Sequence, residues 1–202
     1  MIYEDFNPKY HDTFKIAKLK YDVDFRTYEM FFNDKNKAIL AIKYSLEITD
    51  PSDYFKMKIV LDDESKEILA FLSYYSKNKN TFIKDTITLF QNLKFIDALK
   101  LFLIDLLDYF VLADFTDNDI YLAELAVDSS KRGQGIGAKI LNHCIESFKN
   151  KGYKKLILDV DFRNDKAKTL YEKLGFKEFN KKRLKFLNFE RGMYNMEYEL
   201  NE

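Results

Sequence analysis

A glycine-dense run in the second half of the chain, RGQGIG from Arg132 to Gly137, could bind a ligand through its backbone. It follows a strand-like segment and opens a segment with helical periodicity. Glycines at such a turn let several backbone N–H groups converge without side chains in the way. The positive end of the helix dipole points to the same place. The run therefore predicts a site for a ligand that carries phosphate.

Two common phosphate loops do not fit this run. The dinucleotide-binding fingerprint has glycines spaced G-x-G-x-x-G, whereas Gly133, Gly135 and Gly137 are spaced one position too tightly. The nucleoside-triphosphate loop requires Gly-Lys-Ser/Thr, whereas Gly137 is followed by Ala138. Both classes of phosphate site are excluded.

The segments around the run alternate between strand and helix patterns. Apolar residues in the helix after the run recur at short helical intervals from Ile136 to Phe148, which places them on one face. Asn164 is a good N-cap for the next helix, and Gly175 is a good end for it. The order of strand, helix and strand predicts that the two strands pair in parallel. The expected elements are a strand at 120–127, a helix at 135–150, a strand at 155–160, a helix at 165–174 buried through Ala167, Leu170, Tyr171 and Leu174, and strands near 176–187 and 192–200.

The first half of the chain has helical segments on both sides of a hairpin. Residues 8–50 show helical periodicity, which is expected to end at Asp50-Pro51 because the residue before proline disfavours helix. Two antiparallel strands are expected at 55–61 and 67–75, and residues 82–113 return to helix in two segments. Together with the second half, these segments predict a mixed α/β (α+β) fold with a mixed central sheet flanked by helices.

Length and composition suit one compact domain over residues 1–202. Of the 202 residues, 47% are apolar, two are proline and six are glycine, which supplies a single core and argues against a flexible linker. The single cysteine, Cys144, excludes an internal disulfide and fits a reducing compartment. We find no secretion signal, and the most apolar stretch, Leu101 to Ala113, is too short to span a membrane. We therefore expect a soluble, cytoplasmic protein.

The charges are unevenly distributed although they sum to zero. Between Leu101 and Ser130 there are seven acids and no lysine or arginine. Between Lys131 and Arg191 there are 17 bases and seven acids. The simpler interpretation is a solvated surface. The alternative is a basic half that holds a polyanion beside an acidic segment that attracts a cation.

A second motif follows the glycine run after about thirty residues. The motif R-x-x-G-x-G at 132–137, followed by N-x-x-A-x-x-x-Y-x-x-x-G-F at 164–176, resembles the GNAT superfamily of acyl-CoA-dependent N-acyltransferases. The resemblance covers residues 119–200 closely and implies that this half binds the cosubstrate. The helical blocks at 8–50 and 82–113 match in general position only, and in such proteins they form the acceptor side.

The resemblance implies where acetyl-CoA would bind. Two parallel strands would splay apart and expose backbone groups that bind the pantetheine arm. The N–H groups of the glycine loop would hold the pyrophosphate, Arg132 would add charge, and a lysine would reach the remaining phosphate. No metal is implied. The residues expected to contact acetyl-CoA are Leu125, Ala126, Val127, Arg132, Gly133, Gln134, Gly135, Ile136, Gly137, Asn164, Lys168 and Tyr171.

The resemblance also implies catalytic roles. Tyr171 matches the tyrosine that protonates the departing CoA thiolate, which is general acid catalysis. The competing interpretation is that Tyr171 only completes the apolar stripe of its helix. An amine must lose a proton before it attacks a thioester, so a base is also needed. Glu124, in the strand before the loop, is the first candidate, and Asp159 and Asp161 compete for the role.

The expected function is acetyl transfer from acetyl-CoA to a primary amine of a small molecule or peptide. The alternative is a protein of the same fold that binds an acyl-CoA as a sensor without turnover. His11 and His143 lack the spacing of a metal site, and Cys144 lies on an apolar helix face. The basic run at 181–185 alternates with apolar residues as in a strand, so nucleic acid is not expected as a partner. A membrane is not expected either, and a homodimer is compatible with the sequence.

Overall fold

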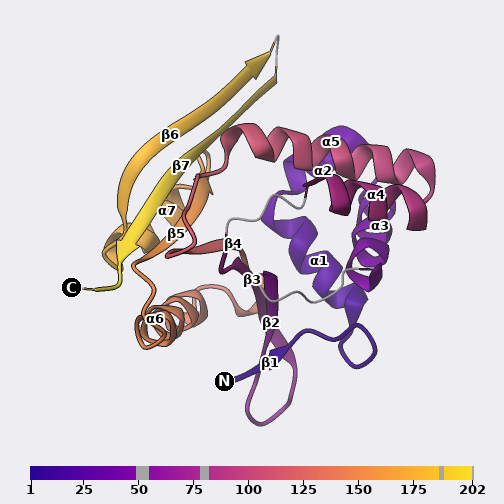
Figure 1. Cartoon of the computed structure of the whole chain (residues 1–202). Helices are drawn as coiled ribbons and strands as arrows, with labels where there is room; N and C mark the ends of the chain where they lie inside the picture. Colours follow the sequence, from indigo (N-terminus) through magenta and orange to yellow (C-terminus); the bar gives the residue numbers. More distant parts are fainter. Residues whose placement is uncertain (49–54, 78–81, 187–188, 202) are drawn as a thin grey trace.

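The structure is a computed structural model that describes residues 1–48, 55–77, 82–186 and 189–201. Its centre is a sheet of seven strands in the order β1-β2-β3-β4-β5-β7-β6 (Figure 1). β4 and β5 pair in parallel, while the other neighbouring strands of this sheet pair antiparallel, so the predicted mixed sheet is confirmed. The strands are β1 (Ile2–Asp5), β2 (Phe55–Leu61), β3 (Ile68–Tyr75), β4 (Ile120–Val127), β5 (Lys155–Asp161), β6 (Lys177–Phe186) and β7 (Phe189–Glu199).

The helices form where the periodicity of the sequence predicted them. Residues 8–50 contain three helices, 82–113 contain two, and the stop expected at Asp50-Pro51 lies outside the described residues. Asp12 caps the first helix because its side chain accepts a hydrogen bond from the Lys15 amide at 2.9 Å. The helices are α1 (Thr13–Val23), α2 (Phe25–Phe32), α3 (Lys35–Ile48), α4 (Phe82–Asn92), α5 (Phe95–Val111), α6 (Ile136–Lys149) and α7 (Asp165–Lys173).

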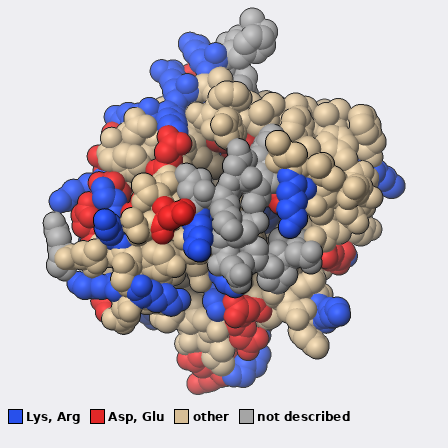
Figure 2. All heavy atoms as spheres, in the orientation of Figure 1, with Lys and Arg blue, Asp and Glu red and all other residues tan. Residues whose placement is uncertain are grey.

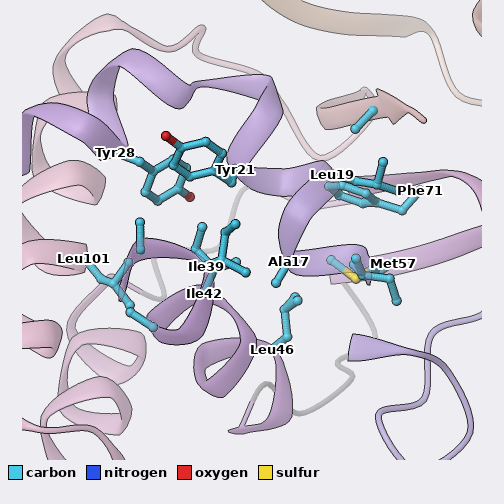
Figure 3. Packing of buried hydrophobic residues seen from close by; sticks show 14 of the residues in the cluster. Ala17, Leu19, Tyr21, Tyr28, Ile39, Ile42, Leu46, Met57, Phe71 and Leu101 are labelled. Carbon is cyan, nitrogen blue, oxygen red and sulfur yellow. The ribbon is translucent and has the colours of Figure 1, made fainter. Parts of the chain in front are cut away.

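Two apolar cores separate the helices into layers on opposite faces of the sheet. In the first core, residues of α1, α2, α3 and α5 pack together with residues of the sheet, and Ile39 of α3, Phe71 of β3 and Leu101 of α5 are examples (Figure 3). In the second, α6 packs on the other face through Ile140 and Leu141. This alternation places neighbouring residues of β4 in different cores. Side chains on the two faces of β4 therefore contact different helical layers.

The apolar stripe of α6 is confirmed, whereas that of α7 is more exposed than predicted. The six stripe residues of α6, from Ile136 to Phe148, are all buried. The stripe of α7, which includes Leu170 and Tyr171, is only half-buried. This short helix packs against the periphery of the second core, so its apolar residues keep some contact with solvent.

The surface differs between the two ends of the sheet. Figure 2 shows lysine and arginine side chains gathered on the side of α6, β6 and β7, while the side of α4 and α5 is mostly uncharged. Ile83, Phe95 and Tyr109 on those two helices are 71%, 69% and 65% exposed. The charge asymmetry predicted from the sequence is therefore partly visible on the surface.

Candidate active site

β4 and β5 separate from each other after three residue pairs. The parallel ladder joins Ile120 to Leu156 and ends where Leu122 faces Leu158, although both strands continue. β4 stays paired with β3 as far as Val127. A gap therefore opens between β4 and β5 at their carboxyl ends, as the resemblance implied.

Alternate residues of β4 turn their backbone groups into this gap. The Asp128 amide donates to the Leu69 carbonyl at 2.8 Å, so Asp128 faces β3. Because backbone groups alternate in direction along a strand, those of Ala126 also face β3, and those of Leu125 and Val127 face the gap. The backbone of Leu125 and the amide of Val127 are thus available to an extended ligand, whereas Ala126 contributes by keeping β4 in the sheet.

The glycine loop begins directly after this gap. A short 3-10 turn, Ser129–Lys131, leads to Arg132, whose Nε donates to the Val127 carbonyl at 3.1 Å. Gly133 and Gly135 have φ values of 79° and 74°, which side chains rarely permit. Arg132, Gly133, Gln134 and Gly135 are exposed. The turn therefore holds a positive side chain and an open backbone beside the gap.

The start of α6 leaves its amides without a side-chain cap. Gly135 is the N-cap residue and has no side chain to accept from the first turn. Ile136 is buried and anchors the helix in the second core. Gly137 has ordinary backbone angles, and a Cβ there would contact Leu170 and Val127 at 3.7 and 3.8 Å. The uncapped N–H groups fit a pyrophosphate, which is the anion that acetyl-CoA would bring.

Two predicted contact residues at α7, Asn164 and Lys168, already have partners within the protein. Asn164 is the predicted N-cap, because its side chain accepts from the Ala167 amide at 3.2 Å. Lys168 forms ion pairs with Glu172 and with Glu178, the latter at 3.8 Å. A phosphate would have to compete with these two carboxylates for the Lys168 ammonium.

Tyr171 lies on the inner side of α7. Its ring contacts Phe176 with 5.7 Å between centroids, and the side chain packs at the edge of the second core. Burial raises the pKa of Tyr171 to about 12. Among the described residues, none forms a hydrogen bond with its hydroxyl. The phenol is thus protonated at neutral pH and has its proton available for donation.

Glu124 lies on the opposite side of β4, facing α1. Ser73 of β3 pairs with Glu124 while Tyr74 pairs with Leu122, so Ala123 is the extra residue of a bulge. The Lys20 ammonium donates to Glu124 Oε1 at 2.6 Å, and the Ser73 hydroxyl donates to Oε2 at 3.0 Å. Both oxygens of the carboxylate are therefore engaged, by partners that the sequence alone did not indicate.

Lys20 projects from α1 into an acidic environment. Burial opposes its charge, but Glu124 and the nearby Asp105 and Asp108 more than offset this, so the pKa of Lys20 is raised. Lys20 also forms part of the wall of a cavity of about 140 Å³, together with Leu46, Phe55 and Met57 among others. The Lys20 side chain therefore has open space beside it.

Asp159 marks the point on β5 where the gap begins. It accepts hydrogen bonds from the Ala113 amide at 2.9 Å, from the Tyr121 hydroxyl at 2.6 Å and from the Asn195 side chain. Burial is the largest influence and raises the pKa of Asp159 despite these three donors. Asp159 is thus a carboxylate whose environment brings its pKa closer to neutrality.

Asp161, two residues further along β5, is held differently. Arg163 donates to both of its oxygens, at 2.7 and 2.5 Å. Burial opposes the charge of Asp161, but the bonds from Arg163 outweigh it, and the pKa of Asp161 is lowered. Asp161 is the weaker base of the two.

A buried arginine on β7 connects this strand to the α1–α2 corner and to α5. Arg191 of β7 is 4% exposed and donates to Asp24 at 2.5 Å, to Thr27 and to Asp108. These partners lie at the α1–α2 corner and on α5. Arg191 therefore fixes the corner of the helical layer relative to β7.

The remaining reactive side chains have structural roles. The His11 ring bonds to Asn7 and Glu4, and His143 stacks on Tyr3. Cys144 is buried, and burial raises the pKa of its thiol to about 12, which agrees with a core residue. Within the described part of the chain, no three His, Cys, Asp or Glu residues are grouped to hold a metal ion. No helix in the same part has the length and hydropathy to cross a membrane.

Comparison with known proteins identifies relatives of this fold. A family model described as the acetyltransferase (GNAT) family matches residues 2–176. N-alpha-acetyltransferase 30 of Schizosaccharomyces pombe is 34% identical over 68 residues, which are 34% of this chain and 45% of that protein. Thialysine N-epsilon-acetyltransferase of Sus scrofa is 39% identical over 70 residues, which are 35% of this chain and 41% of that protein. The matched segment thus spans less than half of either relative. An N-acetyltransferase structure from Staphylococcus aureus Mu50 has a TM-score of 0.67 and 18% identity, covering 98% of this chain and 100% of that one.

Proposed function

Because this chain belongs to the GNAT family of acetyltransferases, we propose that it transfers an acetyl group from acetyl-CoA to a primary amine. The observation that carries the proposal is the gap between β4 and β5, which leads directly to the uncapped start of α6. An extended ligand with a pyrophosphate fits this arrangement. Its arm would meet Leu125 and Val127, and its phosphates would meet the loop from Arg132 to Gly137.

Tyr171 supplies the proton for the leaving group in this proposal. The thiolate of CoA takes up a proton as the C–S bond breaks, and a nearby acid can supply it. The raised pKa of Tyr171, about 12, keeps the phenol protonated at neutral pH, which is the form that a general acid needs. The position of Tyr171 on α7, on the same face as the glycine loop, supports this role.

The base would be a carboxylate on the opposite face of β4 and β5. Glu124 and Asp159 are the two candidates, since Arg163 lowers the pKa of Asp161. Glu124 is already bonded to an ammonium, which resembles the amine that it would deprotonate. Asp159 has the raised pKa that suits a base near neutral pH. Both side chains lie away from α6 and α7, so an acceptor would approach from the helical layer of α1 to α5.

The acceptor is proposed only as a class. One relative is named for an α-amino group and another for the ε-amino group of thialysine. Both are primary amines. We propose a primary amine of a peptide or small molecule as the acceptor.

The test is a panel of free amines and peptides incubated with purified protein and acetyl-CoA, with release of free CoA thiol as the readout. Peptides with free N-termini and peptides with a free lysine should be included separately. Transfer to at least one amine, lost in Tyr171→Phe, is the expected result. Tight binding of acetyl-CoA without any thiol release would indicate a binding protein and contradict the proposal.

A further inference from the structure

The Lys20 ammonium occupies the place where an acceptor amine must come. An amine that gives its proton to Glu124 has to lie within hydrogen-bond distance of that carboxylate. Lys20 Nζ already lies 2.6 Å from Glu124 Oε1. The two residues are 104 positions apart in the chain, so only the fold brings them together. A primary amine of the protein itself is thus held on the candidate base.

We propose that Lys20 is a self-acetylation site, modified by the protein's own acetyltransferase activity. The inference rests on the proposed function, with Glu124 as the base that serves this amine. Lys20 is 25% exposed and lies beside a cavity lined by Leu46 and Met57, so its side chain has room to move. Glu124 directly precedes Leu125, whose backbone groups face the gap, so the Lys20 amine is held next to the strand segment that would meet acetyl-CoA.

The reaction needs no reagent beyond acetyl-CoA. Glu124 takes one proton from the Lys20 ammonium, and the neutral amine attacks the thioester carbonyl. The new N–C bond forms as the C–S bond breaks, and Tyr171 protonates the departing thiolate. The second proton leaves the nitrogen and replaces, through solvent, the proton that Tyr171 gave up. The net products are CoA thiol, an amide on Lys20 and the one proton taken by Glu124. No group is oxidised or reduced.

Lys15 provides a comparison on the same helix. Its ammonium forms an ion pair with Asp128 at 3.0 Å and is 34% exposed, which is similar to Lys20. Asp128 lies beyond the end of β4 and faces β3, so Lys15 is not held on either candidate base. Uncatalysed acetylation by acetyl-CoA would therefore affect Lys15 at least as much as Lys20. Faster acetylation of Lys20 than of Lys15 would therefore have to result from the position of Lys20 beside Glu124.

Acetylation of Lys20 would change the surroundings of Glu124. The amide has no positive charge, so Glu124 would lose its ion pair and keep only the Ser73 hydroxyl. The carboxylates of Glu124, Asp105 and Asp108 would then face one cation fewer. The modified protein would thus present to an external amine a Glu124 that has no ion pair.

The experiment follows acetylation of the purified full chain by peptide mass spectrometry during incubation with acetyl-CoA. Lys20 should be acetylated at least 10-fold faster than Lys15, at a rate per molecule that does not change on dilution. Lys20→Arg keeps a positive charge that can pair with Glu124 but removes the amine, so the Lys20 signal should vanish while Lys15 is unaffected. Lys15→Arg should leave acetylation of Lys20 unchanged. Tyr171→Phe should slow Lys20 acetylation and leave Lys15 at its uncatalysed rate.

The amine panel separates this inference from the proposed function. Transfer to external amines together with equal, slow acetylation of Lys15 and Lys20 would overturn self-acetylation alone. Absence of transfer to any amine, Lys20 included, would overturn both. A rate at Lys20 that falls on dilution would also contradict the inference, because it would indicate transfer between molecules.

Discussion

A pair of glycine substitutions at the two ends of α6 tests the loop assignment. Gly135 begins the helix with φ of 74°, and Gly152 follows its other end with φ of 79°. A Cβ on either residue would meet no atom within 4 Å. Gly135→Val and Gly152→Val therefore impose the same backbone strain without a steric clash. Only Gly135 lies in the proposed phosphate loop.

The expected sizes of the two effects differ. A residue with a side chain in the left-handed region costs about 1–2 kcal/mol of folding free energy, and both variants should show this loss. In Gly135→Val, the side chain and any shift in φ also displace backbone N–H groups from the anion. One hydrogen bond to a charged group contributes about 1.5–3 kcal/mol. The affinity for acetyl-CoA should thus fall about 10- to 150-fold in Gly135→Val and stay within about 2-fold of the parent in Gly152→Val.

Titration calorimetry with acetyl-CoA measures the affinity, and thermal unfolding measures the stability of the same samples. Equal loss of affinity in the two variants would show that the effect comes from destabilisation and not from the loop. Parental affinity in Gly135→Val would refute the assignment of the loop as the phosphate site.

Three further predictions concern the side chains. Tyr171→Phe should lower turnover about 100-fold with little change in acetyl-CoA affinity or melting temperature, whereas a large stability loss with normal turnover would favour a core role. Of Glu124→Gln and Asp159→Asn, the variant that removes the base should abolish the fall of kcat/KM at acidic pH. If Asp159 is the base, this fall should occur above the usual carboxyl range in the parent, because burial raises the pKa of Asp159. Arg191→Met should lower the free energy of unfolding by about 3 kcal/mol in denaturant titrations, because it leaves two partly buried carboxylates unpaired, and a change below 1 kcal/mol would contradict the joining role of Arg191.

The cosubstrate half of the site could be predicted from the sequence because its signals are local. The glycine loop, the cap at Asn164 and the stripe of α6 each depend on residues within a few positions of one another. Those patterns fix backbone direction, and the parallel pairing of β4 and β5 follows from the order of the elements. The strand at 120–127 has the predicted bounds for this reason.

The acceptor half could not be predicted in the same way because its contacts join distant segments. Arg191 reaches Asp24, which lies 167 positions earlier. β1 was not predicted, since four residues at the edge of a sheet carry too little pattern. The sequence did contain one indication that Lys20 has a partner. Lys20 lies on the same face of α1 as the buried Ile16 and Ala17, and a lysine on a buried face requires a partner.

The acidic segment between Leu101 and Ser130 was interpreted as one that could attract a cation. In the structure, some of its carboxylates are paired with cations of the protein itself. Lys20 is bonded to Glu124, Arg191 to Asp108, and Lys182 of β6 to Asp114 at 2.8 Å.

These internal cations set a condition for the acceptor. Arg191 is buried and joins β7 to the α1–α2 corner and to α5, so an incoming amine cannot replace it without opening the helical layer. Lys20 is partly exposed and has open space beside it, so it is the cation that can move. An acceptor served by Glu124 must therefore either displace the Lys20 ammonium or follow its neutralisation. In Lys20→Ala, which removes the competitor, the KM for the acceptor amine should fall while the affinity for acetyl-CoA stays constant. An unchanged acceptor KM would indicate that the amine reaches Asp159 without passing Glu124.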